Sequence, residues 1–439
     1  MLLALLPVTV AFGSLAPVQV GSMHATATDA VVLALAAGAA GEICFSAHHA
    51  RSGVQSWVSS IPLSLPYRTL LSLLGALLLL MMLSALWATD RVAALKEILK
   101  WGEALTIMVV VPRFLATRRD IWLVLYVMFG VAVCEALLGI AQGTVLASLQ
   151  HVSADRGVRV VGTFGQPNPF AGYLNLTLPI LLALAAWGKP LTVRWLSGAG
   201  ALVLGCALAL TQSRGAALGL AGAMLAMAWL GWPSMRRWVL SAVAGVLSSI
   251  GVALATHRLT VPVLLERLGW RPLTNAALSG QVTDANFSTL ERLAHWAAAV
   301  RMIAAHPLGG VGIGNYAAAY PRYAVPRWSL ALGHAHNLYL NMAAEIGILG
   351  GILYLVWVGV GLWLVWPYGA FPTPSATSVE GWDPPIMGIF GVGVALALHN
   401  LFDDLTTHSM LMQWILLIMC AQMLPLARLH KGSINFANE

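Results

Sequence analysis

The chain has 439 residues, of which 59% are hydrophobic and only 9% are charged, and its mean hydropathy is +0.79. Soluble globular domains carry about 25% charged residues, so this composition excludes a soluble protein and indicates an integral membrane protein. The formal net charge is +7, but the basic residues lie in short connections between apolar segments. That distribution reflects membrane topology and argues against a nucleic-acid-binding surface.

Apolar stretches of roughly 20 residues, long enough to cross a bilayer, recur along the whole chain. They predict an all-α integral membrane protein with about twelve transmembrane helices. The expected spans lie near 2–20, 27–47, 67–88, 94–112, 121–147, 168–187, 195–211, 214–231, 237–256, 335–366, 385–402 and 408–427. The stretch 335–366 is long enough to tilt in the bilayer or to project beyond it.

Lysine and arginine are concentrated in alternate short connections, which sets the expected orientation. If the N-terminus is cytoplasmic, the cytoplasmic connections carry Arg51, Arg68, Arg113, Arg118, Arg119, Lys189, Arg194, Arg236, Arg237, Arg428 and Lys431. The opposite connections carry Arg91, Arg156, Arg159 and Arg214. By the positive-inside rule, both termini are cytoplasmic. We therefore expect spans one to nine in 1–255, an outer helical loop in 256–334, and spans ten to twelve with a short cytoplasmic tail in 335–439.

The outer loop contains a predicted helix followed by a glycine-rich stretch. Ser288 and Glu291 form an S-x-x-E pattern that is typical of a capping box at a helix start, and Pro307 ends the helix. The stretch PLGGVGIGNY comes next, and its glycines fit a turn with close backbone approach. A phosphate-binding loop is disfavoured, because no strand precedes the stretch and the outer face is poor in ATP.

Arg214 stands in LTQSRGAALGL, in a very tight outer turn between two apolar segments. An arginine at membrane depth is costly unless it is paired or faces water, so it is a functional candidate. Gln212 lies beside it and is a secondary candidate. The alternative is a boundary arginine that extends to the lipid headgroups.

Two arginines lie on the predicted outer helix. Arg292 and Arg301 are nine positions apart and therefore point to opposite faces, at about 100° per residue. Arg292 shares a face with His295 and Trp296. We expect Arg292 to bind the ligand and Arg301 to be structural, while a solvated helix face remains the alternative for both.

His336 begins the predicted tenth span, and Asn337 follows it. The positive end of the helix dipole and partial desolvation would both keep the imidazole neutral near pH 7, which suits a general base. A capping histidine is the alternative, and His334 could be the base instead. Asp403 and Asp404 form an adjacent acidic pair at another outer turn, but two carboxylates alone make a weak case for a cation site.

Arg214, Arg292 and His336 together point to a site at the outer surface of the membrane. Arginine suits phosphate oxygens because its planar fork makes paired, charge-assisted hydrogen bonds. A large lipid-facing surface favours a substrate with a lipid tail and a diphosphate head. Without ATP outside, transfer needs a donor that is already activated, such as a sugar linked to polyprenyl diphosphate. The arginines would stabilise the leaving group, and the histidine would accept a proton from the incoming hydroxyl.

Three motifs in order resemble the O-antigen ligase/polymerase superfamily. They are TQSRG after a span, ERLAHW with HPLGGVGIGNY in the outer loop, and HNLYLNMAAEIGILG at the start of a span. The resemblance is strongest from Gly162 to Gly350 and implies a GT-C-like glycosyltransferase architecture, with a helical periplasmic loop over the active site. It also implies a multi-pass protein of the bacterial inner membrane. Arg214 and Arg292 match the diphosphate-binding positions, and His336 matches the essential histidine.

The activity that the resemblance favours is O-antigen ligation. The implied partners are undecaprenyl-diphosphate-linked O-antigen, the lipid A–core acceptor and the surrounding membrane lipids, with no nucleic acid. The implied mechanism is inverting and uses no metal or other cofactor. The alternatives are an O-antigen polymerase, a protein O-oligosaccharyltransferase and a polytopic lipid or polysaccharide transporter. A transporter should show an internal repeat of its halves, and the sequence shows none.

Overall fold

The computed structural model describes residues 2–12, 18–20, 23–49, 64–146, 159–256, 282–283, 286–367 and 383–435, which are helical apart from one short β-hairpin and the connections. The elements are η1 (Leu2–Leu5), α1 (Leu6–Phe12), β1 (Val18–Val20), β2 (Met23–Ala25), α2 (Ala27–His49), α4 (Leu65–Ser84), α5 (Arg91–Phe114), α6 (Arg118–Ala141), η3 (Gln142–Leu146), α8 (Pro167–Asn175), α9 (Leu178–Trp187), α10 (Leu191–Thr211), α11 (Arg214–Gly231), η4 (Pro233–Met235), α12 (Arg236–Ala255), α15 (Phe287–Ala305), α16 (Tyr316–Tyr323), α17 (Leu338–Leu364), α18 (Pro384–His399) and α19 (Met410–Asn435). Most of the predicted loop 256–334 before residue 286, and the connection between α17 and α18, lie outside the described residues.

The helices confirm a multi-pass membrane protein, although fewer of them qualify as spans than we predicted. Among the described residues, six stretches are long and apolar enough to cross a bilayer. They are Leu65–Ser84, Arg118–Val145, Pro167–Trp187, Leu191–Thr211, Arg214–Gly231 and Leu338–Leu364. Helices near the other predicted spans are shorter, as in α18, or carry more charge, as in α5. The count of twelve spans and the GT-C-like architecture therefore stay predictions.

The first predicted span, 2–20, is wrong. Helix α1 ends at Phe12, and Val18–Val20 forms strand β1, which pairs with β2 in an antiparallel hairpin. The apolar composition of this stretch suggested a continuous helix. However, its sequence contains Gly13 and Pro17, and proline removes a backbone donor and clashes with the preceding helical turn.

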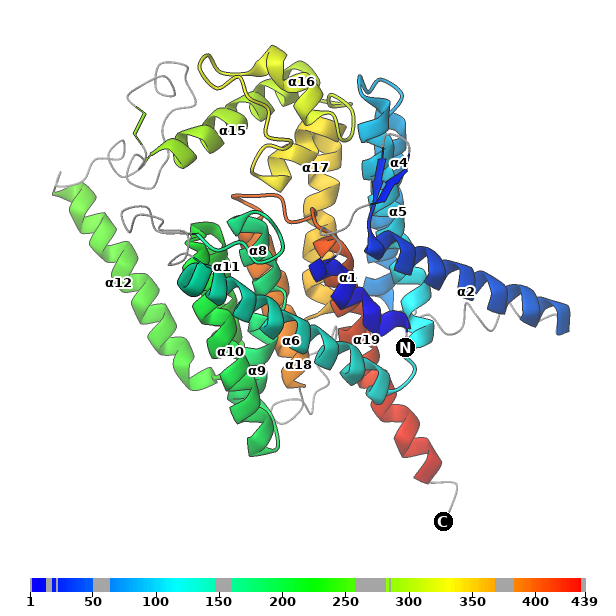
Figure 1. The fold of residues 1–439 in the computed structure, drawn as a ribbon. Helices are drawn as coiled ribbons and strands as arrows, with labels where there is room; N and C mark the ends of the chain where they lie inside the picture. Colours follow the sequence, from blue (N-terminus) through cyan, green and yellow to red (C-terminus); the bar gives the residue numbers. More distant parts are fainter. Residues whose placement is uncertain are drawn as a thin grey trace.

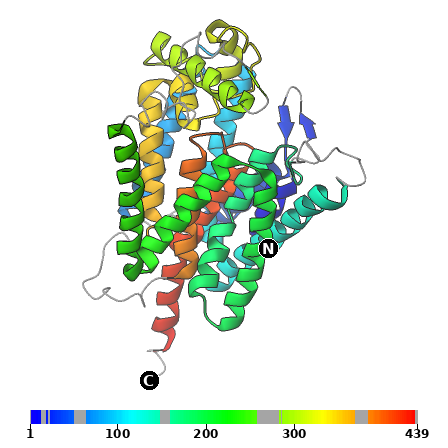
Figure 2. The same ribbon diagram turned by 90° about the vertical axis from the view of Figure 1, so that its left-hand side faces the viewer.

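The bundle and the outer segment occupy opposite parts of the molecule. Within the bundle, α18 packs against α9 and α11, and α17 packs against α4. Helices α15 and α16 sit beyond one end of α17, and the C-terminus emerges at the opposite end (Figures 1 and 2). The main hydrophobic core runs through the bundle, whereas α15 and α16 belong to two small clusters of their own. The outer segment is therefore a small packed unit placed on the bundle.

The outer helix begins differently from the prediction. Its N-cap is Asn286, whose side chain accepts a hydrogen bond from the Thr283 amide at 2.8 Å. Ser288 lies inside the first turn of α15 and does not cap it, so the predicted capping box with Glu291 is wrong. The Asn286 side chain bonds to a residue before the helix and not to an amide of the first turn, so α15 starts without a side-chain cap. The helix ends at Ala305, just before Pro307, as expected.

The glycine-rich stretch after α15 is fastened into a break in α17. At this break Gly347 has φ 80° and ψ 171°, outside the helical region. The Val311 amide donates to the Ala344 carbonyl at 2.9 Å, and the Ile348 amide donates to the Pro307 carbonyl at 2.9 Å. A Cβ on Gly347 would lie 2.1 Å from the Leu308 carbonyl oxygen, so only glycine fits there. The prediction of a packing turn with close backbone approach is confirmed.

The Glu345 side chain accepts hydrogen bonds from the backbone amides that a phosphate-binding loop would need for its ligand. Its carboxylate accepts hydrogen bonds from the backbone amides of Gly314 and Tyr316, each at 3.0 Å. Glu345 itself is buried, so these bonds satisfy a carboxylate that would otherwise lack partners. This arrangement agrees with the prediction that the stretch does not bind phosphate.

Candidate active site

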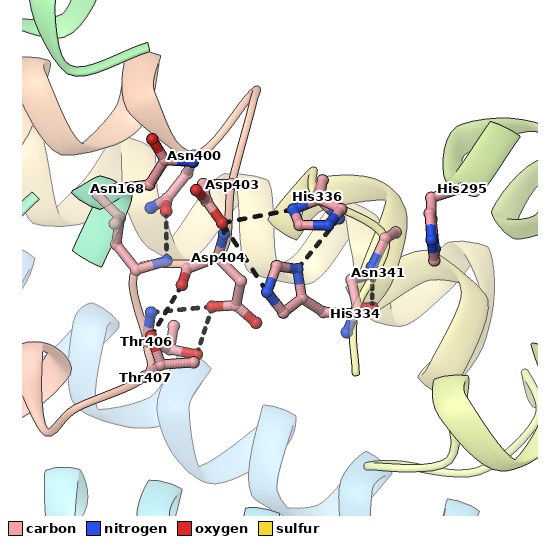
Figure 3. A network of polar contacts seen from close by, with 12 residues as sticks. Asn168, His295, His334, His336, Asn341, Asn400, Asp403, Asp404, Thr406 and Thr407 are labelled. Atoms are coloured by element: carbon pink, nitrogen blue, oxygen red, sulfur yellow. Dashed lines mark hydrogen bonds and ion pairs between the residues drawn. The ribbon is translucent and has the colours of Figure 1, made fainter. Parts of the chain in front are cut away.

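Two histidines and an aspartate from distant parts of the chain meet at the end of the bundle that carries α15 and α16. His334 and His336 lie just before α17, and Asp403 lies in the turn between α18 and α19. The Leu338 amide donates to the Asn400 carbonyl at 2.9 Å, which ties the start of α17 to the end of α18. Figure 3 shows both imidazoles directed toward the Asp403 carboxylate. Neither pairing was predicted from the sequence.

The His336 ring faces Asp403 through Nδ1 and packs against the rings of His295 and His334. Its Nδ1 lies 3.7 Å from Asp403 Oδ1, just beyond hydrogen-bond length. Among the described residues, neither ring nitrogen of His336 makes a hydrogen bond, although both are buried. The Nε2 atom can therefore accept a proton while Nδ1 faces the carboxylate, which is the arrangement of an oriented general base.

His336 lies before the helix and does not begin it, which corrects the sequence interpretation. The N-cap of α17 is Asn337, whose side chain accepts from the Leu340 amide at 3.0 Å. His336 has φ 51°, a conformation that is uncommon for non-glycine residues and clusters at functional sites. Its backbone amide donates to His334 Nδ1 at 3.1 Å. Asn337 is thus the capping residue, and His336 projects from a tight turn in front of it.

The second histidine and the aspartate have shifted proton affinities. Burial lowers the pKa of His334, in keeping with a neutral ring whose Nδ1 accepts from the His336 amide. Burial alone would raise the pKa of Asp403, but its contacts with the neighbouring histidine rings outweigh burial and lower the pKa below its ordinary value. Asp403 is therefore ionised at neutral pH and faces both rings as a carboxylate. His334 Nε2 lies 3.8 Å from Asp403 Oδ1.

The neighbouring carboxylate, Asp404, belongs to a different set of contacts. Its Oδ1 accepts from the amide and the hydroxyl of Thr406, at 2.9 and 2.7 Å. The Thr406 hydroxyl also lies 3.2 Å from Lys100 Nζ, which is paired with Glu97 at 2.7 Å on α5. Asp404 therefore fixes the α18–α19 turn to α5, which leaves Asp403 as the carboxylate that faces the histidines.

Three arginines lie near one another beside the histidines. Burial, and then the positive charges of Arg292 and Arg214, lower the pKa of Arg159. Arg214 is at the start of α11, Arg292 is on α15, and Arg159 precedes α8. The Nε of Arg292 is buried and has no hydrogen-bond partner among the described residues. Like charges at close range repel one another, so this cluster favours a multivalent anion.

The secondary arginine and glutamine candidates have structural positions. Arg301 Nη1 donates to the carbonyls of Tyr323 and Ala324, at 3.0 and 3.2 Å, so it closes α16 onto α15. Gln212 has φ 53° and ends α10, and Ser213 caps α11 by accepting from the Ala216 amide. The tight turn before Arg214 is thus built as predicted. Arg301 points away from the Arg292 side of its helix, in agreement with the spacing argument.

His295 stands behind His336 in a stack of aromatic rings. It lies parallel to Tyr320 at 4.5 Å and meets His336 edge-on at 5.5 Å. The Tyr316 hydroxyl donates to the His295 carbonyl at 2.9 Å and lies 3.0 Å from its Nδ1. Burial lowers the pKa of His295 to about 4, so its ring is neutral at physiological pH. His295 is therefore a packing partner for His336 rather than a second charge.

An apolar groove opens between α10 and α11 and ends at Arg214. Its volume is about 610 Å³, and most of its lining is aliphatic or small. Its walls are Gly205, Leu208, Ala209, Gln212, Ser213, Arg214, Ala217, Leu220, Ala221 and Met224. An apolar trough with a guanidinium at its outer end suits a ligand that has a hydrocarbon tail and an anionic head.

The same histidines and aspartate could also hold a metal ion. Among the described residues, His334, His336 and Asp403 offer ring nitrogens and a carboxylate oxygen that all lie within 4.8 Å of one another. Two imidazoles and a carboxylate are a donor set that zinc accepts. A bound cation would occupy the nitrogen lone pairs, so metal binding and proton acceptance at His336 exclude one another.

Comparison with known families gives one match. Residues 199–355 match the family described as O-antigen ligase. The matched segment holds TQSRG, the outer helix with Arg292, the glycine-rich turn and the start of α17 with His336. This match over residues 199–355 supports the O-antigen ligase superfamily for the chain. No curated protein matches it.

Two residues of the candidate site, Arg159 and Asp403, lie outside the matched segment, and the sequence did not predict them as site residues. Arg159 was assigned to the outer connections only as a marker of topology. The sequence offers Asp403 only as half of an acidic pair that makes a weak case for a cation site. The sequence GTFGQPNPF, which follows Arg159 closely, contains glycines and prolines that fix a loop, and this was the available signal for that arginine. No local pattern relates Asp403 to His336, because their contact depends on the packing of α17 against α18.

Proposed function

We propose that the protein transfers O-antigen glycan from undecaprenyl diphosphate to a sugar hydroxyl of lipid A–core, at the periplasmic face of the bacterial inner membrane. The observation that carries the proposal is the convergence of Arg159, Arg214 and Arg292 beside the His336–Asp403 pair, at the mouth of an apolar groove. These features offer three things that the reaction needs: anion binding, proton acceptance and accommodation of a lipid chain.

The arginine cluster fits the diphosphate of the donor. Three guanidinium groups near one another are stabilised by an anion that carries several negative oxygens, and their planar forks bind phosphate oxygens in pairs. Arg292 has a buried Nε with no partner among the described residues, which a phosphate oxygen would satisfy. The same groups would stabilise the charge that grows on the leaving diphosphate, so they would lower the barrier as well as bind the donor.

The groove between α10 and α11 supports a lipid-linked donor. It begins at Arg214 and continues along apolar side chains of two spans. Each buried methylene stabilises a hydrocarbon chain by about 0.8 kcal/mol relative to water, although competing lipid tails reduce this advantage inside a bilayer. The groove would therefore direct the chain and set where the diphosphate lies.

The chemical step can be written with the groups at the site. The acceptor hydroxyl oxygen attacks the anomeric carbon of the donor sugar, and the bond from that carbon to the phosphate oxygen breaks. His336 Nε2 takes the hydroxyl proton, and the Asp403 carboxylate stabilises the charge that the ring acquires. The polyprenyl diphosphate leaves with the electron pair of the broken bond and is held by the arginines. Attack from the face opposite the leaving group inverts the anomeric configuration.

A polymerase of the same superfamily is the second candidate, and cells can separate the two. The family description, O-antigen ligase, favours ligation. Cells that lack a ligase should lose capped lipopolysaccharide while polymer accumulates on the lipid carrier. If the deletion instead leaves single repeats attached to the core, the protein is a polymerase.

The arginines provide the test of the mechanism in purified components. We expect Arg159→Lys, Arg214→Lys and Arg292→Lys each to reduce transfer from lipid-linked donor to lipid A–core in liposomes, because lysine replaces a fork with a point charge. Arg322→Lys is the matched control, since Arg322 is exposed on α16. Loss of transfer in the control to the same degree as in the three site variants would argue against a diphosphate at the arginine cluster.

A further inference from the structure

Two aromatic side chains adjoin both the arginines and the His336–Asp403 pair and have no part in the mechanism above. Trp296 is on α15, one turn after Arg292, and Phe402 immediately precedes Asp403. Their ring centres are 6.3 Å apart and their planes are inclined by 36°. Both side chains are half-buried. They therefore form a tilted aromatic pair that is partly open to solvent.

The orientation of Trp296 is fixed by the histidine turn. Its Nε1 donates to the His336 carbonyl at 3.2 Å, so the polar edge of the indole is satisfied and its faces remain for apolar contact. Trp296 also packs against the hydrophobic cluster of the outer segment. A ring held in this way is pre-organised, and little conformational entropy is lost when a ligand stacks on it.

Phe402 lies on the bundle side, in a turn whose backbone is held by hydrogen bonds. Its amide donates to the His399 carbonyl at 2.9 Å within the turn that follows α18. The Cβ of Phe402 would lie only 3.4 Å from a Cβ added to Gly215. Phe402 is therefore close to the residue that follows Arg214. The two rings thus connect the base, the aspartate and the arginine cluster through rigid elements.

We infer that Trp296 and Phe402 form a stacking platform for a pyranose ring of one of the two saccharide substrates. The C–H groups on the apolar face of a pyranose carry partial positive charge, and an aromatic face is negative, so the two attract. The inference rests on the proposed glycan transfer. It goes further by assigning sugar recognition to two residues that neither bind the diphosphate nor move the proton.

The test compares side chains that keep or remove the aromatic face. In liposomes, Trp296→Leu and Phe402→Leu should each raise KM about tenfold for one saccharide substrate and change kcat less. Titrating the donor at saturating acceptor, and then the reverse, identifies which sugar stacks. Trp296→Phe keeps an aromatic face but lacks the N–H group, so it should restore much of the KM. Phe287→Leu is the matched control, because Phe287 is at the far end of α15 and packs on Trp328.

A sugar-free probe distinguishes a sugar platform from a lipid contact. Polyprenyl diphosphate without a glycan should inhibit wild type and Trp296→Leu with the same inhibition constant. Weaker inhibition of the variant would mean that the rings hold the lipid, and it would overturn the inference. Equal losses of kcat in Trp296→Phe and Trp296→Leu, with unchanged KM, would also overturn it, because the indole would then act only through its hydrogen bond to His336. If the wild type transfers no glycan, the proposed function fails; if it transfers glycan and both leucine variants match it, only the platform fails.

Discussion

Replacing Asp403 by asparagine is the sharpest test of how the site moves a proton. The change removes the negative charge but keeps the shape of the side chain. Asp403 Oδ1 accepts a hydrogen bond from the Asp404 amide at 2.9 Å, and an asparagine oxygen can still accept it. The carboxylate lies 3.7 Å from His336 Nδ1. At that distance two unit charges attract by about 1 kcal/mol in water and about 4 kcal/mol at an effective dielectric constant of about 20.

The burial of Asp403 favours the larger of these energies. The attraction acts fully only when the imidazole is charged, and the ring becomes charged as it takes the proton. Losing the attraction therefore raises the free energy of the transition state more than that of the bound substrates. Since 1.4 kcal/mol corresponds to tenfold, we expect Asp403→Asn to lower kcat about a hundredfold to a thousandfold with little change in KM. The assay is transfer from purified lipid-linked donor to lipid A–core in liposomes, with the thermal unfolding midpoint measured in parallel.

Asp404→Asn is the matched control for this prediction. It removes the adjacent charge, which acts on the neighbouring His334 ring, while the Asp404 carboxylate accepts hydrogen bonds from Thr406 and, among the described residues, none from His336. We expect its kcat to fall less than tenfold. A stably folded Asp403→Asn protein with wild-type turnover would refute the role of the carboxylate, and His336 would then have to act without an oriented partner.

The other predictions concern the histidines, a possible cation and the break in α17. His336→Ala should lower transfer about a hundredfold or more, in line with the usual contribution of a general base. His334→Ala should retain more activity, and the same liposome assay compares the two variants. Chelation with EDTA should leave transfer intact, and added Zn²⁺ should inhibit it by occupying His336, so loss of activity on chelation would reveal a required metal. Because the folded pKa of His295 is about 4, below the unfolded value of about 6.5, the unfolded chain binds the extra proton as the pH falls. The free energy of unfolding should therefore drop by about 2 kcal/mol between pH 7 and pH 5. The unfolding midpoints of wild type and His295→Asn should be closer together at pH 5 than at pH 7. Gly347→Ala should lower the unfolding midpoint markedly, while Gly359→Ala, whose Cβ would meet nothing within 4 Å, should not.

The sequence predicted the apolar helices best where length and composition agreed. The tight turn at Gln212–Arg214 and the end of α15 before Pro307 lie where they were expected, because each depends on local backbone chemistry. The family motifs also placed Arg214, Arg292 and His336 at one end of the bundle. The turn and the helix end are properties that neighbouring residues in the sequence determine.

The missing features depend on contacts between distant residues. Asp403 reaches His336 only because the start of α17 is bonded to Asn400 at the end of α18. The break at Gly347 is invisible in an apolar run that would otherwise form a straight span, and it exists because the turn after α15 donates to and accepts from the exposed backbone groups. Composition could not decide the first predicted span either, since an alternating VQV segment is equally compatible with a strand.

The break in α17 also has a mechanical consequence. The turn of helix that follows His336 is bonded to the outer segment through Ala344 and Glu345, whereas the helix after Gly347 packs among the spans. A span changes its tilt when the bilayer becomes thicker or thinner, and a straight helix would carry that rotation to its end. Because α17 is interrupted at Gly347, the part of the helix inside the bilayer can change its tilt without moving His336 relative to Asp403. We therefore expect the alignment of His336 with Asp403 to depend less on bilayer thickness than it would in a straight helix.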